Sequence, residues 1–223
     1  MIAAVGAQDI VQRCYNRDDA NPTFDPNNSW CQQFERDQSN GGVIELKQLQ
    51  QNQAFINTSG IDFTVNYGVP IGETAGDLGF QWVTTWTEKY ETQTTSVDPV
   101  FDYVGTIGST TGSSVPEWKS SLVTTWSRDA WQVSATARYI DSMVHANTVT
   151  GGSPLSNTGV PSTTYLDLGL KFDVTENLSV RGSIINVTDQ EPRLYSPNVQ
   201  ANTDPSLYDV LGRSFFVGIN FRL

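Results

Sequence analysis

Hydrophobic and polar residues alternate over repeated segments of about ten residues along most of the chain. At the C-terminal end, Phe215, Val217, Ile219, Phe221 and Leu223 fall on one face and polar residues on the other, with Phe216 as a misfit. A period of two is that of a β-strand with one apolar face. Strands are predicted near 61–70, 78–90, 116–127, 130–143, 163–173, 177–187 and 213–223. The fold class expected is all-β, an antiparallel meander of about seven or eight strands.

Short and long connections alternate between the predicted strands. Those near 71–77, 127–130 and 174–177 are short, whereas those near 92–114, 145–161 and 189–212 are long and polar. Outer-membrane β-barrels have short turns on one side and long loops on the other, and strands of about ten residues cross the bilayer. We therefore expect sequence neighbours to pair antiparallel, with the three short turns at one end of the sheet.

Aromatic residues toward the strand ends are expected to form the girdle of such a barrel. They are Trp82, Trp86, Trp118, Trp126, Trp131, Tyr139 and Tyr165. The alternative is a soluble domain of two sheets, in which these aromatic side chains belong to the core.

The first 56 residues lack this alternation. Ala7 to Cys14 is expected to form one or two helical turns, and a polar hairpin is expected around 37–42. The domain organisation predicted is therefore a loop segment at 1–56, outside the membrane, followed by barrel strands at 57–223.

Charge and composition narrow the possible functions. The chain has 13 Lys and Arg against 24 Asp and Glu, a net charge of −11 without a basic cluster, which argues against nucleic-acid binding. Its apolar runs are too short for a transmembrane helix. Because residues 1–20 lack the pattern of a signal peptide, we expect that the chain either stays in the cytoplasm or is part of a longer protein.

The search for catalytic, cofactor or metal sites gives no candidate cluster. His145 is the single histidine and is expected to be an exposed loop residue rather than a catalytic base. Asp18, Asp19 and Asp25 lack the spacing of a calcium loop. We therefore expect no enzyme activity, no metal and no cofactor.

Four motifs give the chain a family resemblance. They are the step into a strand at 57–62, the stretch 178–189 that ends Ile184-Ile185-Asn186-Val187-Thr188-Asp189, the run 208–218 with its Gly-Arg-aromatic entry into the final strand, and the pair Cys14-Tyr15 and Trp30-Cys31. Together they resemble the C-terminal part of a TonB-dependent outer-membrane receptor, over nearly the whole chain. The resemblance implies the last third of a transmembrane barrel of about 22 strands, which is an open curved sheet in isolation.

The resemblance also implies a function and partners. Such receptors actively take up a scarce nutrient, which is siderophore-bound iron, cobalamin or carbohydrate, through a barrel filled by a plug domain. The expected partners are outer-membrane lipid, the rest of the barrel, the plug, TonB through the N-terminal part, and the barrel-assembly machinery. The last strand, with Phe215, Val217, Ile219, Phe221 and Leu223, would carry the assembly signal, and Cys14 and Cys31 would form an extracellular disulfide.

Polar residues of the strands are expected to face the lumen or the plug, since charged side chains are costly in lipid. They are Asp62, Asn66, Arg138, Lys171, Arg181, Asn220 and Arg222. One alternative is a free-standing outer-membrane barrel of eight strands with a structural or adhesion role, in which residues 43–53 supply the eighth strand. An enzyme-bearing barrel is a third alternative.

We predict that the chain alone neither inserts nor transports, because a sheet of about seven strands leaves two edges of unpaired backbone groups. Expressed by itself it should aggregate. The test is to refold the purified chain into detergent or lipid. A heat-modifiable, protease-resistant monomer would contradict the prediction and favour the free-standing barrel.

Overall fold

The computed structural model describes residues 2–52, 55–93, 99–108, 114–151, 156–195 and 202–222. The chain forms two compact units. One comprises Met1–Asn57 with Glu91–Phe101, and the other comprises Thr58–Tyr90 with Asp102–Leu223.

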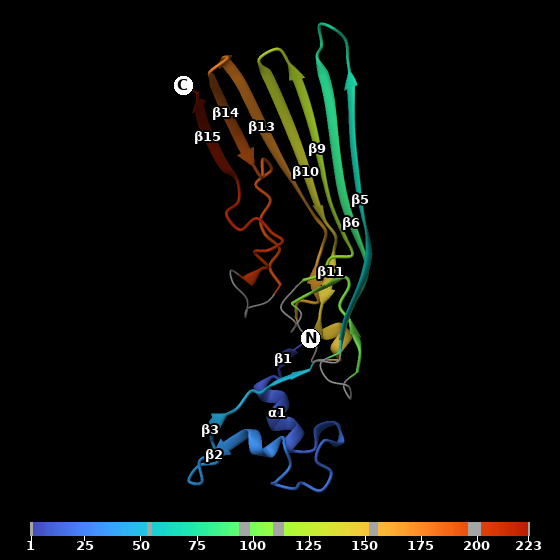
Figure 1. Ribbon diagram of the computed structural model, residues 1–223, viewed down its shortest axis with the longest axis vertical. Coiled ribbons are helices and arrows are strands. Elements are labelled where there is room, and N and C mark those ends of the chain that lie inside the picture. The colour runs from blue at the N-terminus through green and yellow to red at the C-terminus, as the bar shows by residue number, and fades with distance from the viewer. Residues whose placement is uncertain are drawn as a thin grey trace. The chain divides into compact units, whose positions relative to one another are not determined.

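A large antiparallel sheet dominates the second unit (Figure 1). Its strand order is β15-β14-β13-β10-β9-β6-β5, and the short strand β7 pairs with β6 as the eighth strand among the described residues. The bounds are β5 Phe55–Pro70, β6 Asp77–Gln93, β7 Phe101–Asp102, β9 Trp118–Arg128, β10 Trp131–Ile140, β13 Thr163–Thr175, β14 Leu178–Ile185 and β15 Ser214–Phe221. The predicted all-β meander is confirmed, and over the described residues the sheet is open.

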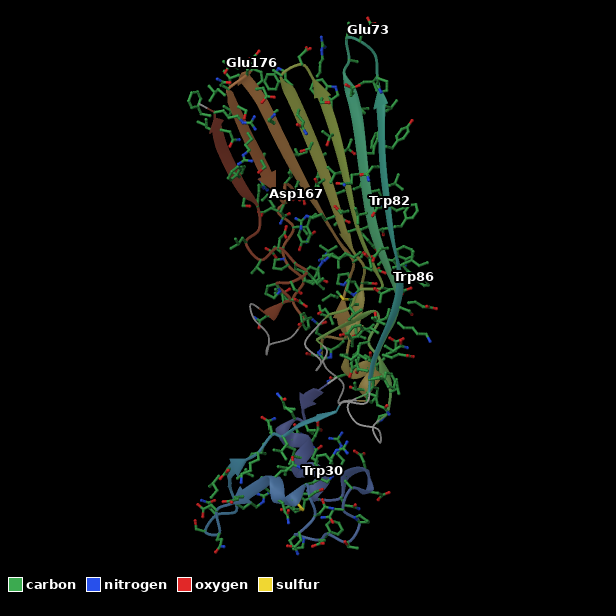
Figure 2. All side chains as sticks on the ribbon, in the orientation of Figure 1. Trp30, Glu73, Trp82, Trp86, Asp167 and Glu176 are labelled. Atoms are coloured by element: carbon green, nitrogen blue, oxygen red, sulfur yellow. A yellow bond between two sulfur atoms is a disulfide. The ribbon has the colours of Figure 1, made fainter. Side chains whose placement is uncertain are left out.

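The three short turns lie at one end of this sheet, as predicted. Figure 2 shows Glu73 and Glu176, which belong to two of these turns, at the same end. At the third turn Arg128 pairs with Trp131, and Trp131 lies opposite Phe172 of β13, close to the turn that contains Glu176. The tight turn before β6 requires a glycine, because Gly76 has φ +88° and a Cβ there would lie 2.2 Å from the carbonyl oxygen of Ser127.

Of residues 43–53, the described part, 43–52, does not supply a strand of the large sheet, so that part of the free-standing-barrel alternative is wrong. Among the described residues, β3 (Val43–Leu46) pairs with β2 (Phe34–Arg36), and β4 (Gln50–Asn52) pairs with β1 (Ile2–Ala4). Lys47 and Gln48 separate β3 from β4 and interrupt the apolar alternation that a wall strand needs.

The first unit contains the predicted helix, hairpin and disulfide. Helix α1 (Ala7–Cys14) ends at a disulfide between Cys14 and Cys31, whose Cα atoms are 4.8 Å apart. Two short 3₁₀ turns, Arg17–Asp19 and Cys31–Gln33, lie in the same unit. Asn21 is buried beside the disulfide, where its amide donates to the carbonyl oxygens of Cys14 (2.8 Å) and Asp25 (3.0 Å).

The compact core of the second unit lies at the end of the sheet opposite the short turns. A small sheet forms there from β8 (Thr106–Ile107), β11 (Met143–His145) and β12 (Gly159–Val160), next to the one-turn helix α2 (Asn147–Thr150). Its side chains pack with the ends of β10 and β13 and with the loops after β14. The buried members are Ile107, Ile140, Met143, Val160, Tyr165, Tyr195 and Tyr208. In the described part of the chain, no helix has both the length and the apolar character needed to cross a membrane.

We predict that replacing Cys14 and Cys31 together by serine destabilises the first unit by about 3 kcal/mol, because the bridge limits the unfolded chain. Native-state hydrogen exchange of residues 2–52 measures this loss. The amides of β9 and β10 serve as the internal control and should keep their protection. Unchanged exchange around α1 would show that the bridge contributes no stability.

Candidate functional site

The register of the large sheet separates most polar and apolar side chains onto two faces. Lys171 of β13 lies opposite Gln132 of β10 and Arg181 of β14, so these three side chains share a face. Arg138 lies an even number of residues beyond Gln132 in β10 and points to the same side. Asn220 lies two residues beyond the β15 position opposite Arg181, so it belongs to the same face. The face continues to β5, because the Thr85 hydroxyl, on the same side, donates to Asp62. We call this the polar face. Asn66, four residues beyond Asp62 in β5, also belongs to it.

Six of the seven residues predicted to face a lumen thus share one side of the sheet: Asp62, Asn66, Arg138, Lys171, Arg181 and Asn220. Arg222 lies beyond the last residue of β15, and its backbone N–H donates to the carbonyl oxygen of Asn177 (2.9 Å). That this side faces a lumen remains a prediction.

The opposite side, the apolar face, presents large hydrophobic side chains. Phe215, Val217, Ile219 and Phe221 of β15 are 66% to 76% exposed, and Leu170 of β13 is 44% exposed. Leu223, the last residue of the expected assembly signal, lies outside the described residues. Such a continuous apolar surface requires a cover of lipid or protein.

Phe216, the misfit of the alternation, has a partner on the polar face. Its ring lies 5.6 Å from the guanidinium carbon of Arg181. A Cβ at Gly218 would lie 3.0 Å from the same ring and 3.1 Å from Nε of Arg181. The aromatic ring therefore covers a cation on β14, in space that the glycine leaves open.

The sequence-based predictions for Tyr165 and His145 are wrong. Tyr165 does not join a girdle: it is fully buried on the polar face, with its ring 4.9 Å from the guanidinium carbon of Arg138. His145 is not an exposed loop residue, because it is a buried member of β11 whose Nδ1 accepts from the N–H of Asn147 (3.1 Å). Both residues lie where loops pack over the sheet end, which alternation alone does not reveal.

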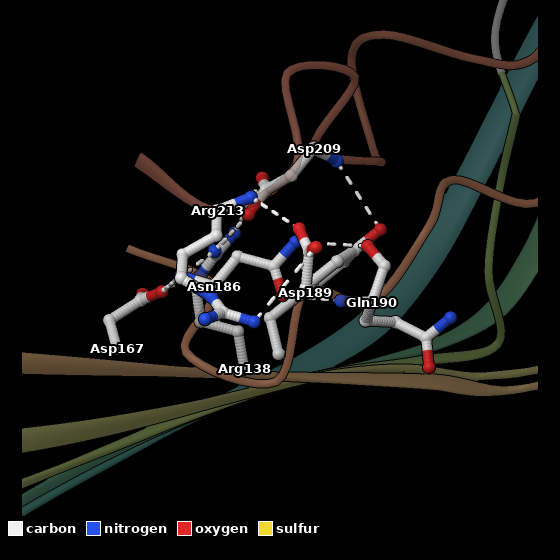
Figure 3. Close-up of polar contacts among 8 residues, drawn as sticks. Arg138, Asp167, Asn186, Asp189, Gln190, Asp209 and Arg213 are labelled. Carbon is white, nitrogen blue, oxygen red and sulfur yellow. Dashed lines mark hydrogen bonds and ion pairs between the residues drawn. The ribbon is translucent and has the colours of Figure 1, made fainter. Parts of the chain in front are cut away.

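Arg138 is the centre of a polar network on this face (Figure 3). Its Nε donates to Asp167 on the neighbouring strand (2.9 Å) and its Nη1 donates to Asp209 (3.1 Å). Asp167 also accepts from the backbone N–H of Asn186 (2.8 Å). All three charged side chains are partly buried, so their pairing is screened less than that of a surface ion pair.

Asn186 turns the chain out of β14. It is completely buried and has φ +56°. Its side-chain amide oxygen accepts from the backbone N–H of Gln190 (2.8 Å), and its amide nitrogen donates to the backbone carbonyl oxygen of Gln190 (2.9 Å). Asp189 closes the same loop by accepting from the N–H of Arg213 (2.8 Å). The strand-end motif at 184–189 thus ends in a hydrogen-bonded turn, which its residue types alone do not predict.

The segment 202–213 lies against the polar face through buried and polar contacts. Burial raises the pKa of Tyr208 to about 12. Burial also disfavours the charged form of Asp204, but hydrogen bonds from Ser114 and Ser206 outweigh it and lower the pKa of this carboxyl. The Asp204 contacts therefore stabilise the segment at neutral pH and weaken as the pH falls through that lowered value.

A pocket of about 490 Å³ lies between the polar face and residues 205–209. Its polar lining includes Lys119, Ser121, Arg138, Ser206 and Asp209. Over the described residues, no group of three or more His, Cys, Asp or Glu side chains is placed to hold a metal ion. The pocket offers charge and hydrogen bonding to a ligand.

We predict that Asn186→Ala destabilises the turn after β14 by about 1–3 kcal/mol, because it leaves the partly buried backbone groups of Gln190 without their partners. Hydrogen exchange at 186–190 and 202–213 should rise. Asn177→Ala, in the exposed turn before β14, is the matched control. Equal exchange in the two variants would contradict this role for Asn186.

Comparison with solved structures identifies the same fold. The ferric enterobactin receptor of Pseudomonas aeruginosa, in a single-substitution mutant, aligns with a TM-score of 0.56 at 11% identity over 84% of this chain. A double mutant of that receptor gives 0.55 at 12% identity over 84%. The siderophore receptor PiuA of Acinetobacter baumannii aligns less well, with a TM-score of 0.45 at 18% identity over 74%.

The chain spans about a quarter of the length of these receptors, covering 25%, 25% and 22% of them respectively. No curated protein sequence matches the chain. The family model described as TonB dependent receptor-like, beta-barrel matches residues 14–187, from the disulfide to two residues past the end of β14. With its open antiparallel sheet of one polar and one apolar face, the chain belongs to the TonB-dependent receptor-like β-barrel family.

Proposed function

We propose that this chain is the C-terminal part of the barrel wall of a TonB-dependent transporter in the outer membrane, which actively takes up a scarce nutrient. The observation that carries the proposal is the two-faced sheet. Arg138, Lys171 and Arg181 share one face, and the exposed apolar side chains of β13 and β15 share the other. An Arg or Lys at the bilayer midplane costs about 2–4 kcal/mol on the lipid side of a barrel, so lipid would cover the apolar face.

The polar face would then line the lumen or contact a plug domain, and β5 and β15 would pair with the rest of the barrel. Both strands are at the ends of the sheet order over the described residues. Unpaired backbone groups of an edge strand cannot be satisfied by lipid. Contacts with TonB would belong to the N-terminal part of such a receptor, and the barrel-assembly machinery would recognise the β15 end.

The long loops opposite the short turns would lie outside the cell, as would the first unit with its disulfide, which is compatible with an oxidising environment. Siderophore-bound iron is the favoured cargo among siderophore, cobalamin and carbohydrate, because the receptors with the similar fold are named for ferric enterobactin. The role is that of a transporter wall, without catalysis.

A free-standing barrel of eight strands with a structural or adhesion role is the less favoured alternative. It needs a closed sheet, whereas β5 and β15 have no partner on their outer side in the described part of the chain. The segment that would have supplied its extra strand pairs within the first unit.

We predict that deleting the gene of the intact receptor abolishes uptake of one ⁵⁵Fe-labelled siderophore from a panel of catecholate, hydroxamate and carboxylate types, and that deleting TonB does the same. Labelled cobalamin and maltodextrin test the other two cargo classes.

Leu170→Lys, on the apolar face, should lower the amount of folded receptor in the outer membrane.

The matched control is Ser134→Lys, on the polar face opposite Gly169, which should leave the amount of folded receptor unchanged. Heat-modifiable mobility on gels measures folding. Equal loss in both variants would contradict the assignment of the faces, and uptake that persists without TonB would contradict active transport.

A further inference from the structure

Arg138 has two carboxylate partners of different kinds. Asp167 comes from the adjacent strand β13 and is itself held by the backbone N–H of Asn186 (2.8 Å). Asp209 comes from the connection between β14 and β15 and reaches the guanidinium only through its side chain. One partner is therefore fixed by the sheet, and the other can leave by a side-chain rotation.

Contacts other than those with Asp209 also hold the guanidinium. Its Nε and Nη2 donate to the two oxygens of Asp167 (2.9 and 3.2 Å), and the ring of Tyr165 lies 4.9 Å from its central carbon. One further N–H group on each of Nη1 and Nη2 donates to Asp209. This is the geometry with which arginine binds a carboxylate-like group through two parallel hydrogen bonds.

The segment that carries Asp209 stays packed for independent reasons. Tyr208 and Thr203 are almost completely buried, and the Thr203 hydroxyl donates to the carbonyl oxygen of Arg193 (2.6 Å). The backbone N–H of Asp209 also donates to the hydroxyl of Tyr165 (3.3 Å). Only the Asp209 carboxylate, therefore, needs to move to free the arginine.

Freeing the arginine changes the charge of the pocket beside it. The pocket is lined by Arg138, Lys119 and Asp209, with Ser121 directly opposite Arg138 on β9. Lys119 forms no ion pair within the part of the chain that the structure describes. Without the Asp209 carboxylate, Arg138 still faces Asp167, and Lys119 still interacts with the carboxylate of Asp204. The pocket then has one negative charge fewer and becomes more attractive to an anion.

We propose that Asp209 is a built-in counter-ion that an anionic ligand replaces on Arg138, so that the pocket between β9, β10 and residues 205–209 is a gated site for a ligand with carboxylate-like oxygens. The inference rests on the proposed function, because it describes how one site on the polar face is regulated. The Asp209 carboxylate inhibits binding at this site, and the ligand must compete with it.

The test uses the intact receptor in isolated outer membranes, with citrate as the anionic probe. Ser121→Cys places a reporter thiol opposite Arg138, while Cys14 and Cys31 are joined to each other. Citrate should protect this thiol from a neutral maleimide. The concentration for half-protection should fall on the order of tenfold in Asp209→Asn, and protection should be lost in Arg138→Gln.

Asp173→Asn is the matched control, because it removes the same charge from an exposed ion pair with Lys171 on β13. It should leave protection at the parental value, and the conservative variant Asp209→Glu should stay close to it. If Asp209→Asn does not accumulate, Asp209→Ser removes the same carboxylate and is measured instead.

Citrate protection that is equal in the parental receptor and in the variant without the carboxylate would overturn the proposal. Protection that survives Arg138→Gln would also overturn it. Labelling is read without transport, so a failure here is distinguishable from failure of the proposed function, which the uptake assay measures.

Discussion

The register between neighbouring strands is the constraint on which the rest of this structure depends. Side chains alternate between the two faces of a strand, so a shift by a single residue would move every one of them to the other face. Arg138 lies opposite Ser121 and Tyr165 only in the observed register. The tight turns fix this register at one end, where Gly76 and Asp129 both adopt positive φ.

At the other end of the sheet, hydrogen bonds and ion pairs of polar side chains hold neighbouring segments together, as the tight turns do at the first end. Asp167 connects three segments, since it binds Arg138 of β10 and the backbone of Asn186 while belonging to β13 itself. Breaking one partner of such a partly buried network leaves the remaining charges without compensation. The position of the 202–213 segment therefore depends on a few polar residues as well as on the buried tyrosines.

Much of the sheet could be predicted from the sequence, because alternation over a strand is a local property. Seven strands, their order and the common end of the short turns follow from it. The alternation does not predict the environments of Tyr165, His145 and Phe216, since these come from loops distant in sequence or from a cation on the next strand. Likewise, no local pattern distinguishes Asp167 and Asp209 from other acidic residues, and only the fold brings both to Arg138.

Pairing between neighbours also has a consequence for how the protein folds. In the order β6-β9-β10-β13-β14-β15, each strand of the large sheet pairs with the strand immediately before it and the strand immediately after it. The entropy lost on closing a connection grows only slowly with its length, and chains rich in local contacts fold fast. Such a sheet can grow one hairpin at a time, starting from any tight turn. In a complete barrel, the single pairing that joins the first strand to the last would then be the slow, non-local step.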